Sequence, residues 1–392
     1  MGNRKILPVI VLSQFCCTSL WFAGNGVMGE LAATFHLDQH ALGHLTSAVQ
    51  FGFISGTLVF AVLSVADRFS PSKVFFICSL LGAMMNLGTI LENNNLFSLM
   101  GFRMLTGFFL AGIYPVGMKI ASDYYDKGLG KSLGFLVGAL VIGTASPHLM
   151  KVFTGDLSWR GVLILTSFIA IGGGVMMQVY VPDGPHRRPS QKLDLGASLK
   201  VFQSKPFRSA AFGYFGHMWE LYTFWAFVPF MLMIYLELHM NAYLNIPLMS
   251  FVIIGLGGLA CVAAGFVSMK AGVKKTATIA LGLSCACCLI SPLAFDLESG
   301  VLFIGFLVLW GLFVIADSPM FSTLVAQSAP PEVKGSALTI VNCIGFSITI
   351  ISIQLINYLK DMLDPRYLFM LLAIGPVLGL SALREKGKEI AS

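Results

Sequence analysis

Apolar residues follow one another along this chain in long runs that polar segments separate. Twelve of these runs are near 20 residues or longer, the length at which an α-helix crosses a hydrocarbon layer of about 30 Å. The pattern therefore predicts an all-α membrane protein with twelve transmembrane helices. The predicted spans are residues 6–31, 42–65, 73–92, 97–121, 132–153, 160–181, 207–236, 246–269, 276–295, 299–325, 336–358 and 366–384.

One polar segment is longer than the others and divides the chain near its middle. Residues 183–206 (DGPHRRPSQKLDLGASLKVFQSKP) are basic and contain proline. We interpret them as a central cytoplasmic linker. The linker separates an N-terminal half, residues 1–182, from a C-terminal half, residues 207–392, and each half contains six predicted spans.

The two halves carry similar loops at the same position. The loop after the second span reads LSVADRFSPSK (63–73), and the loop after the eighth span reads GFVSMKAGVKK (265–275). In both, a helix end rich in small residues precedes a basic turn. This is the pattern of a repeated unit with a site between the repeats. We therefore expect two pseudo-symmetric six-helix bundles.

The composition supports a membrane protein and argues against bound cofactors. Apolar residues make up 56% of the chain and charged residues 11%, against roughly 25% charged residues in a soluble domain. The first apolar run follows Met1–Lys5 like a signal peptide, but it is too long for one and is interpreted as an uncleaved span. All eight cysteines lie in apolar runs, which favours buried thiols over disulfides. We expect no metal and no cofactor.

The distribution of positive charge predicts the orientation of the chain. If both termini are cytoplasmic, 20 of the 25 lysines and arginines lie on the cytoplasmic side, as positively charged loops do in inner-membrane proteins. The same distribution explains the net charge of +6 without a nucleic-acid partner. We expect a monomer in the cell inner membrane, surrounded by lipid and serving a small-molecule substrate.

The loop after the second span resembles a signature of the major facilitator superfamily, G-x-x-x-D-R-x-G-R-K-x. Ala66, Asp67, Arg68 and Lys73 match this pattern, whereas the usual residues are replaced at 63, 70 and 71. Arg103-x-x-x-Gly107 in the fourth span is similar to a family arginine motif. The resemblance is to bacterial members, without a subfamily, and it implies two six-helix bundles that transport a solute by alternating access.

The same resemblance implies a charge cluster at the cytoplasmic ends of two helices. Asp67 and Arg68 end the second span and should face Asp123 at the end of the fourth. Such a cluster would hold a cytoplasmic gate closed when the transporter opens outward. Ordinary positive-inside charge would explain Arg68 but not Asp67.

Four ionisable residues lie well inside predicted spans, where each costs about 2.5–3.5 kcal/mol at mid-bilayer and so needs a reason; Glu30 and His148 lie nearer the outer ends of their spans. His217 and Glu220 are three residues apart and share a helix face, which makes them a candidate proton site. Arg103 must meet an acid, backbone carbonyls or an anionic substrate. Asp317 is a candidate for proton or cation binding. The alternative for all four residues is a purely structural role, in which hydrogen bonds or ion pairs fix the packing of the helices.

A second group of candidates consists of polar and aromatic residues expected to line a substrate cavity. Gln14, Trp21 and Asn25 fall on one stripe of the first span, and the alternative is hydrogen bonding between helices. Tyr114 follows Arg103 on the same face. Aromatic residues could also face lipid at the membrane interface. The weaker candidates are Tyr222, Trp225 and Asn342.

These features favour a secondary transporter that moves a small polar or amphipathic solute. GLGKS (128–132) lacks the first glycine of a phosphate-binding loop, so energy should come from a gradient rather than from ATP. The main prediction is proton-coupled import by symport. The alternatives are a proton-antiporting exporter of drugs, metabolites or siderophores and, more remotely, a membrane-embedded enzyme. We expect no enzymatic activity, because no nucleophile or metal spacing converges on the buried acids.

Overall fold

The computed structural model describes residues 6–125, 129–154, 159–187, 195–240, 242–330 and 332–384. Within these ranges the chain forms helices joined by short turns and contains no β-strand. The prediction of an all-α fold is confirmed.

The helices follow one another with few long connections. Before the linker they are α1 (Ile6–Thr18), α2 (Met28–Thr34), α3 (Ala41–Val62), α4 (Val65–Arg68), α5 (Pro71–Gly88), α6 (Leu96–Leu110), α7 (Tyr114–Tyr124), α8 (Leu129–Thr154) and α9 (Trp159–Tyr180). After it they are α10 (Leu195–Lys200), α11 (Lys205–Leu238), α12 (Ile246–Gly255), α13 (Gly257–Ala271), α14 (Val273–Phe295), α15 (Gly300–Ala316), α16 (Ser318–Ser328), α17 (Lys334–Leu359), α18 (Pro365–Leu368) and α19 (Ile374–Arg384).

Eleven segments of the described chain are long and apolar enough to cross a membrane. The first predicted span differs, because it is not one continuous helix. α1 ends at Thr18, the chain turns through residues 19–24, and helix resumes as η2 (Asn25–Val27) and α2. Glycines, which are poor helix formers, stand at Gly24 and Gly26. The twelve-helix fold is confirmed, with its first crossing made of two pieces.

Three further spans are interrupted in their middle. The fourth divides at Ala111–Ile113 between α6 and α7, the eighth at Leu256, and the tenth at Asp317. Glycine or proline stands close to each break, and proline removes a backbone donor and crowds the preceding turn. Membrane helices tolerate such breaks where neighbouring side chains satisfy the freed backbone groups.

Helices of the same half pack mainly on one another. α3 packs on α6 and α5 on α9 in the first half, whereas α11 packs on α17 and α19 in the second. Glycines allow α3 and α6 to touch through their backbones. A Cβ added to Gly52 would lie 1.8 Å from the Met104 carbonyl oxygen, and one added to Gly107 would lie 2.0 Å from that of Val49.

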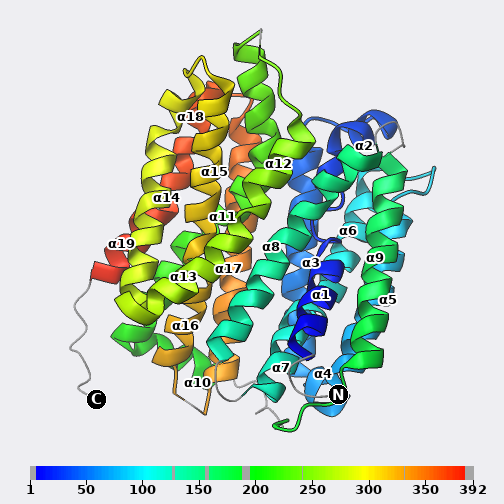
Figure 1. Cartoon of the computed structure of the whole chain (residues 1–392), viewed down its shortest axis with the longest axis vertical. Helices are drawn as coiled ribbons and strands as arrows, with labels where there is room; N and C mark the ends of the chain where they lie inside the picture. The colour runs from blue at the N-terminus through cyan, green and yellow to red at the C-terminus, as the bar shows by residue number, and fades with distance from the viewer. Residues whose placement is uncertain are drawn as a thin grey trace.

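The two bundles meet along two seams, where α3 contacts α17 and α8 contacts α12 and α13. Figure 1 shows the helices running roughly parallel, with α4, α7 and α10 at one end and α2 and α18 at the other. We call these the proximal end and the distal end. Any site between the bundles must therefore lie between these two seams.

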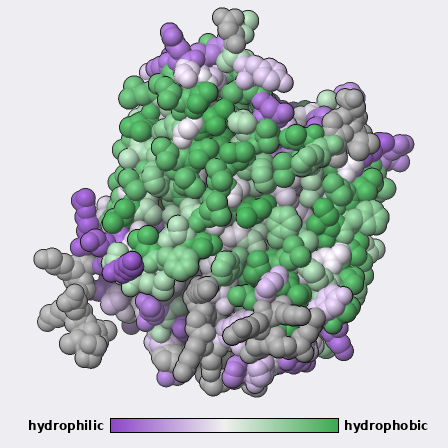
Figure 2. Space-filling model, viewed as in Figure 1, coloured by the Kyte–Doolittle hydropathy of each residue, from purple (hydrophilic) through white to green (hydrophobic). Residues whose placement is uncertain are grey.

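The lateral surface of the molecule is apolar. Figure 2 shows hydrophobic residues covering the middle of the visible face, while hydrophilic residues gather toward the two ends. Large apolar side chains such as Leu293 and Val301 are 70% and 80% exposed. Exposed apolar surface of this extent requires a lipid environment.

The first residues of the predicted linker pack against the proximal end of the N-terminal bundle. Arg187 donates to the carbonyl oxygens of Asp67 (2.9 Å) and Phe69 (2.8 Å), and Ser70 donates to Asp183 (2.7 Å). Residues 188–194 lie outside the described ranges. The rest of the predicted linker is partly helical, with α10 followed by η3 (Val201–Gln203) and by α11 from residue 205.

Candidate functional site

A cavity of about 820 Å³ lies between the two bundles. Its lining comes from α3, α7 and α8 on one side, and from α11 and α13 to α17 on the other. At the proximal end the lining includes Met269 and Lys334, whose side chains are exposed. The cavity therefore reaches the surface at the proximal end.

Direct contacts between α3 and α17 close the distal end. Asn357 Nδ2 donates to the His40 carbonyl oxygen (3.0 Å), and Gln354 Nε2 donates to that of Gly43 (3.0 Å). His40 Nε2 also lies 3.4 Å from Asp361 Oδ2. We call these five residues the distal contact. Because it joins the two bundles, the distal end can open only if these bonds break.

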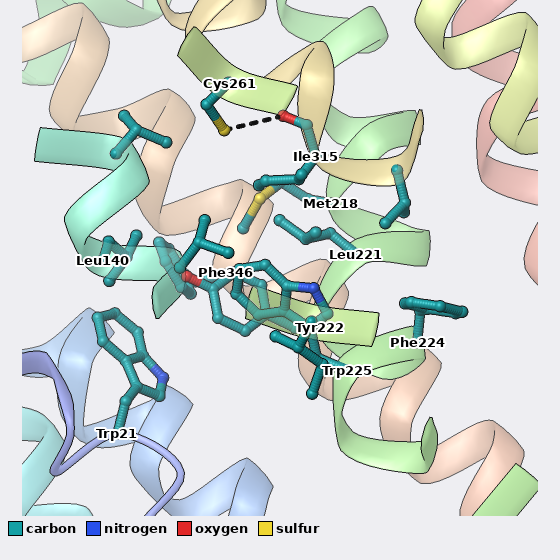
Figure 3. Close-up of a cluster of buried hydrophobic side chains, with 14 of the residues drawn as sticks. Trp21, Leu140, Met218, Leu221, Tyr222, Phe224, Trp225, Cys261, Ile315 and Phe346 are labelled. Carbon is teal, nitrogen blue, oxygen red and sulfur yellow. Dashed lines mark hydrogen bonds between the residues drawn. The ribbon is translucent and has the colours of Figure 1, made fainter. Parts of the chain in front are cut away.

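Aromatic rings from both bundles meet at the inner end of the cavity. Trp21, from the break in the first span, lies 5.7 Å from Tyr222 and 5.8 Å from Phe346 between ring centroids. Tyr222 lies 5.2 Å from Trp225. Figure 3 shows Trp21 facing this group from the N-terminal side. Tyr222, Trp225 and Phe346 line the cavity, so its deepest surface is aromatic.

A buried pair of titratable side chains lies directly behind the cavity wall. His217 Nδ1 of α11 is 2.8 Å from Asp317 Oδ1, at the break between α15 and α16, and the side chains are 1% and 0% exposed. This distance allows an ion pair when His217 is protonated. The adjacent residues Met218 and Ser318 line the cavity. A movement of the cavity wall at Met218 or Ser318 can therefore be passed to the His217–Asp317 pair through the adjoining backbone.

Glu220 has different partners from those expected. Its carboxylate accepts from Trp310 Nε1 (2.6 Å), Ser284 Oγ (2.9 Å) and Cys288 Sγ (3.3 Å), and its side chain is completely buried. The sequence grouped Glu220 with His217, but the structure turns Glu220 toward α14 and α15. Residues three apart are rotated by about 60° around a helix, which is enough to place them against different neighbours.

Arg103 binds the broken part of the first span. Its guanidinium donates to the carbonyl oxygens of Leu20 (3.1 Å) and Trp21 and to Asn86 Oδ1 (3.2 Å). The side chain is 3% exposed and does not belong to the cavity lining. Of the three partners that the sequence allowed, the structure selects backbone carbonyls, helped by an amide oxygen.

The structure brings four of the predicted cavity residues together. Tyr114, Tyr222, Trp225 and Asn342 all line the cavity. Asn342 Oδ1 also accepts a hydrogen bond from the Tyr214 hydroxyl (2.8 Å). These aromatic residues therefore face the cavity rather than lipid.

The stripe predicted on the first span lies behind the cavity surface. Gln14 is completely buried, and its amide has no hydrogen-bond partner in the described chain. Asn25 Nδ2 donates to Thr46 Oγ1 of α3 (2.9 Å), which is the interhelical hydrogen bond considered as the alternative. Neither residue, nor Trp21, is part of the lining in this conformation.

The predicted gate residues lie together at the proximal end. Lys119 Nζ is 3.1 Å from Asp67 and 3.7 Å from Asp123, so one lysine bridges the two acids. Arg68 is exposed. The ion pairs described here join residues of the N-terminal bundle, Arg187 adjoins them, and the proximal end is open in this conformation.

Sequence reasoning missed three residues that organise these groups. Lys119 was counted only as a cytoplasmic charge, although its spacing of four residues from Asp123 favours an ion pair. Tyr214 lines the cavity from α11, and only its position on the same face as Met218 could have indicated this. Trp310 donates to Glu220 from another helix, and no spacing within one helix could have indicated this bond.

Comparisons with known proteins agree with this architecture. A family model described as Major Facilitator Superfamily matches residues 10–353. An uncharacterized transporter of Schizosaccharomyces pombe is 28% identical over 160 residues, which are 39% of this chain and 30% of that protein. The chain therefore spans about a third of the length of this curated relative.

Solved structures with a similar fold are also transporters. A variant of the nucleoside transporter NupG has a TM-score of 0.73 at 14% identity, over 97% of this chain and 99% of that one. The proton:xylose symporter XylE has a TM-score of 0.72 at 14% identity, over 97% and 94%. A bacterial homologue of the lysosomal transporter Spinster, inward-facing and unoccupied, has a TM-score of 0.68 at 14% identity, over 97% and 94%.

These structural likenesses show the fold, and the family match extends over most of the chain. The two bundles, the broken helices and the cavity between them belong to the same architecture. The protein is thus a membrane transporter and not an enzyme. The chain belongs to the Major Facilitator Superfamily.

Proposed function

We propose that the protein imports a small polar or amphipathic solute across the bacterial inner membrane by alternating access, in symport with protons. It works as a monomer with both termini in the cytoplasm. With that orientation, supported by the bias of lysine and arginine, the proximal end is cytoplasmic. The observation that carries the proposal is a cavity open at one end and closed at the other by the distal contact.

The proton site proposed is the His217–Asp317 pair, with Glu220 as a second buried carboxyl. Charges buried without water are stable only while they remain paired. Asp317 stands where α15 and α16 meet, so a change in the angle between these helices would move it relative to His217. Separating the two groups then favours proton uptake or release, which couples protonation to the helix movement.

Proton movement driven by the solute tests this function. The solute is first found by thermal-shift screening of metabolites, siderophores and drugs. The protein is then reconstituted in liposomes that contain a pH-sensitive dye. Adding solute outside, without a pH gradient, should acidify the interior. No pH change during measured solute uptake would contradict proton coupling.

Variants of the buried acids test whether Asp317 and Glu220 carry the proton coupling. Asp317→Asn and Glu220→Gln should abolish the pH change while exchange of labelled solute continues. Glu237→Gln is the matched control, because Glu237 is an exposed carboxylate on the same helix α11. Solute-driven acidification at the normal rate in both buried-acid variants would reject the coupling assignment.

A proton-antiporting exporter is the alternative. The sign of the pH change separates the two, since an antiporter would make the interior alkaline when solute enters. The fifth span, GALVIGTASPHL (138–149), lacks the paired glycines seen in many antiporters of the family, which favours symport.

A further inference from the structure

The cavity wall contains almost no charge. Among the described residues that line it, only Lys334 carries a full charge, and Lys334 is exposed at the mouth. His217 and Asp317 lie behind the wall, 2.8 Å apart, with side chains only 1% and 0% exposed, so neither offers a charge on the cavity surface. A charged solute moving inward from the mouth would lose its hydration without gaining a counter-charge, which is unfavourable in a site of low polarity.

The deepest part of the wall is aromatic. Tyr222 packs against both Trp225 (5.2 Å) and Phe346 (5.1 Å between centroids). Neighbouring rings pack on one another and form one continuous surface. Flat ligands gain most from such a surface, because offset or tilted ring contacts add to the burial of apolar area.

One donor in this surface has no acceptor. Trp225 is completely buried, lines the cavity, and its Nε1–H has no hydrogen-bond partner in the described part of the chain. An indole nitrogen can only donate, and buried donors in proteins are nearly always satisfied. A solute whose acceptor reaches this edge of the indole would supply the partner.

We infer that the cavity binds an uncharged solute with a flat aromatic body and a hydrogen-bond acceptor at its edge. The aromatic body lies against Tyr222 and Phe346, and the acceptor meets Trp225 Nε1. This inference rests on the proposed function for its biological meaning, since it names the class of solute that is transported. Binding itself requires neither a gradient nor proton coupling.

Matched sets of probes test the class of solute. Each set contains a neutral aromatic amide, the corresponding carboxylate, and the amide with its ring saturated. One set is 2-naphthamide, 2-naphthoate and decahydro-2-naphthamide, and a second is built on quinoline. Affinities are measured by equilibrium dialysis on the full chain in detergent. We expect the aromatic amide of at least one set to bind about tenfold or more tightly than both of its partners.

Substitution of the unpaired indole tests the geometry. Trp225→Phe keeps an aromatic ring but removes the donor, and it should weaken binding of the aromatic amide by about fivefold to tenfold. Naphthalene, which has no acceptor, should bind both proteins alike. Trp219→Phe is the matched control: it is the same change on α11, but Trp219 donates to the Leu371 carbonyl (3.2 Å) away from the cavity. It should leave amide binding unchanged.

The outcomes separate this inference from the proposed function. Carboxylates or saturated amides that bind as tightly as the aromatic amides, or no binding by any aromatic amide up to millimolar concentration, would overturn the inference. Equal losses in the Trp225 and Trp219 variants would overturn the role of the indole donor. Tight binding without solute-driven proton movement in liposomes would instead reject proton coupling and leave the solute class standing.

Discussion

Arg103 stabilises the break in the first span by giving its free carbonyl groups a partner. Carbonyl groups of Leu20 and Trp21 lie where the helix has ended, so no backbone N–H of the next turn reaches them. The planar guanidinium donates to both and also to Asn86. Asn86 is itself held by Thr166 and Ser167. The arginine thus connects the broken segment to two further helices.

Arg103→Ala should therefore destabilise the whole protein, by about 3 kcal/mol, because several buried acceptors lose their donor at once. The midpoint of thermal unfolding in detergent measures this. Arg366→Ala serves as the control, since Arg366 lies in a partly exposed ion pair with Asp364 and its loss should change the midpoint little. Equal midpoints for the Arg103 variant and the wild type would show that the break needs no such support.

Glu220 presents a different residue-scale problem, since three donors converge on one carboxylate. Glu220→Gln replaces one acceptor oxygen by an NH₂ group, which then faces a donor. We expect a loss of about 1–3 kcal/mol in stability. Thermal unfolding at constant pH measures the loss, with the exposed Glu237→Gln as the reference. A smaller loss in Glu220→Gln than in this reference would contradict the hydrogen bonds described.

The sequence indicated which polar residues are unusual within an apolar span but not what they contact. Glu220, His217 and Asp317 were found because ionisable side chains are rare in apolar spans. Their partners depend on how each helix is rotated against its neighbours, and the pattern within one helix does not contain that rotation. This is why Glu220 was grouped with a residue on its own helix, although its partners lie on α14 and α15.

At the scale of elements, α3 makes two different close contacts, and each contact is made at a glycine. In the middle of α3, Gly52 lets the helix pack against the backbone of α6 within one bundle. Near its start, Gly43 allows α3 to approach Asn357 of α17, which belongs to the other bundle. The first contact lies within one bundle, whereas the second would have to open in the alternating access that we propose.

The same substitution at these two glycines should have different effects. Gly52→Ala places a Cβ 1.8 Å from the Met104 carbonyl oxygen, and we expect a large fall in thermal stability. Gly43→Ala meets only the Asn357 side chain, at 2.4 Å. The protein can relieve that clash by separating the bundles, so we expect it to remain folded with a more open distal end.

Spin labels at positions 38 and 362, both exposed, measure the distal opening through the distance between them. The distance distribution should shift to longer values in Gly43→Ala. An unchanged distribution together with lowered stability would mean that the α3–α17 seam is fixed and does not open.

Element boundaries followed the apolar runs closely, but the breaks within them did not. The predicted span 207–236 nearly coincides with α11, and 42–65 with α3. A hydrophobic run shows where a helix can lie in lipid, and it is equally apolar on both sides of a break. The sequence contains glycine or proline close to Leu256 and Asp317, but it also contains many glycines that lie in unbroken helices. Only tertiary contacts decide which of them interrupts the helix.

At the scale of the whole molecule, one conformation has been captured. The proximal end is open between the bundles, and the distal contact closes the other end. Lys119 pairs with Asp67 and Asp123 within the N-terminal bundle. Pseudo-symmetry of the two halves could be inferred from their loops. The conformation could not, since one sequence encodes both open states.

The accessibility of introduced cysteines tests this conformation and the predicted orientation together. Thr339 lines the cavity toward its mouth, whereas Ser47 is buried where Gln354 reaches it across the bundles (2.8 Å). If the proximal end is cytoplasmic, a membrane-impermeant maleimide should modify Thr339→Cys in inside-out vesicles but not in right-side-out vesicles. Ser47→Cys should react poorly in both, because the distal contact covers it. The wild-type protein gives the background from the native cysteines.

Loss of the distal contact should reverse part of this pattern. Combining Ser47→Cys with Asn357→Ala removes the bond to His40, and labelling should rise in right-side-out vesicles, where the distal end faces the reagent. Labelling of Thr339→Cys from the outside only would show that the orientation inferred from lysine and arginine is inverted. If Thr339→Cys resisted the reagent in both kinds of vesicle, the proximal end would be closed in the membrane. Since neither result alters the fold, the experiment tests orientation and conformation alone.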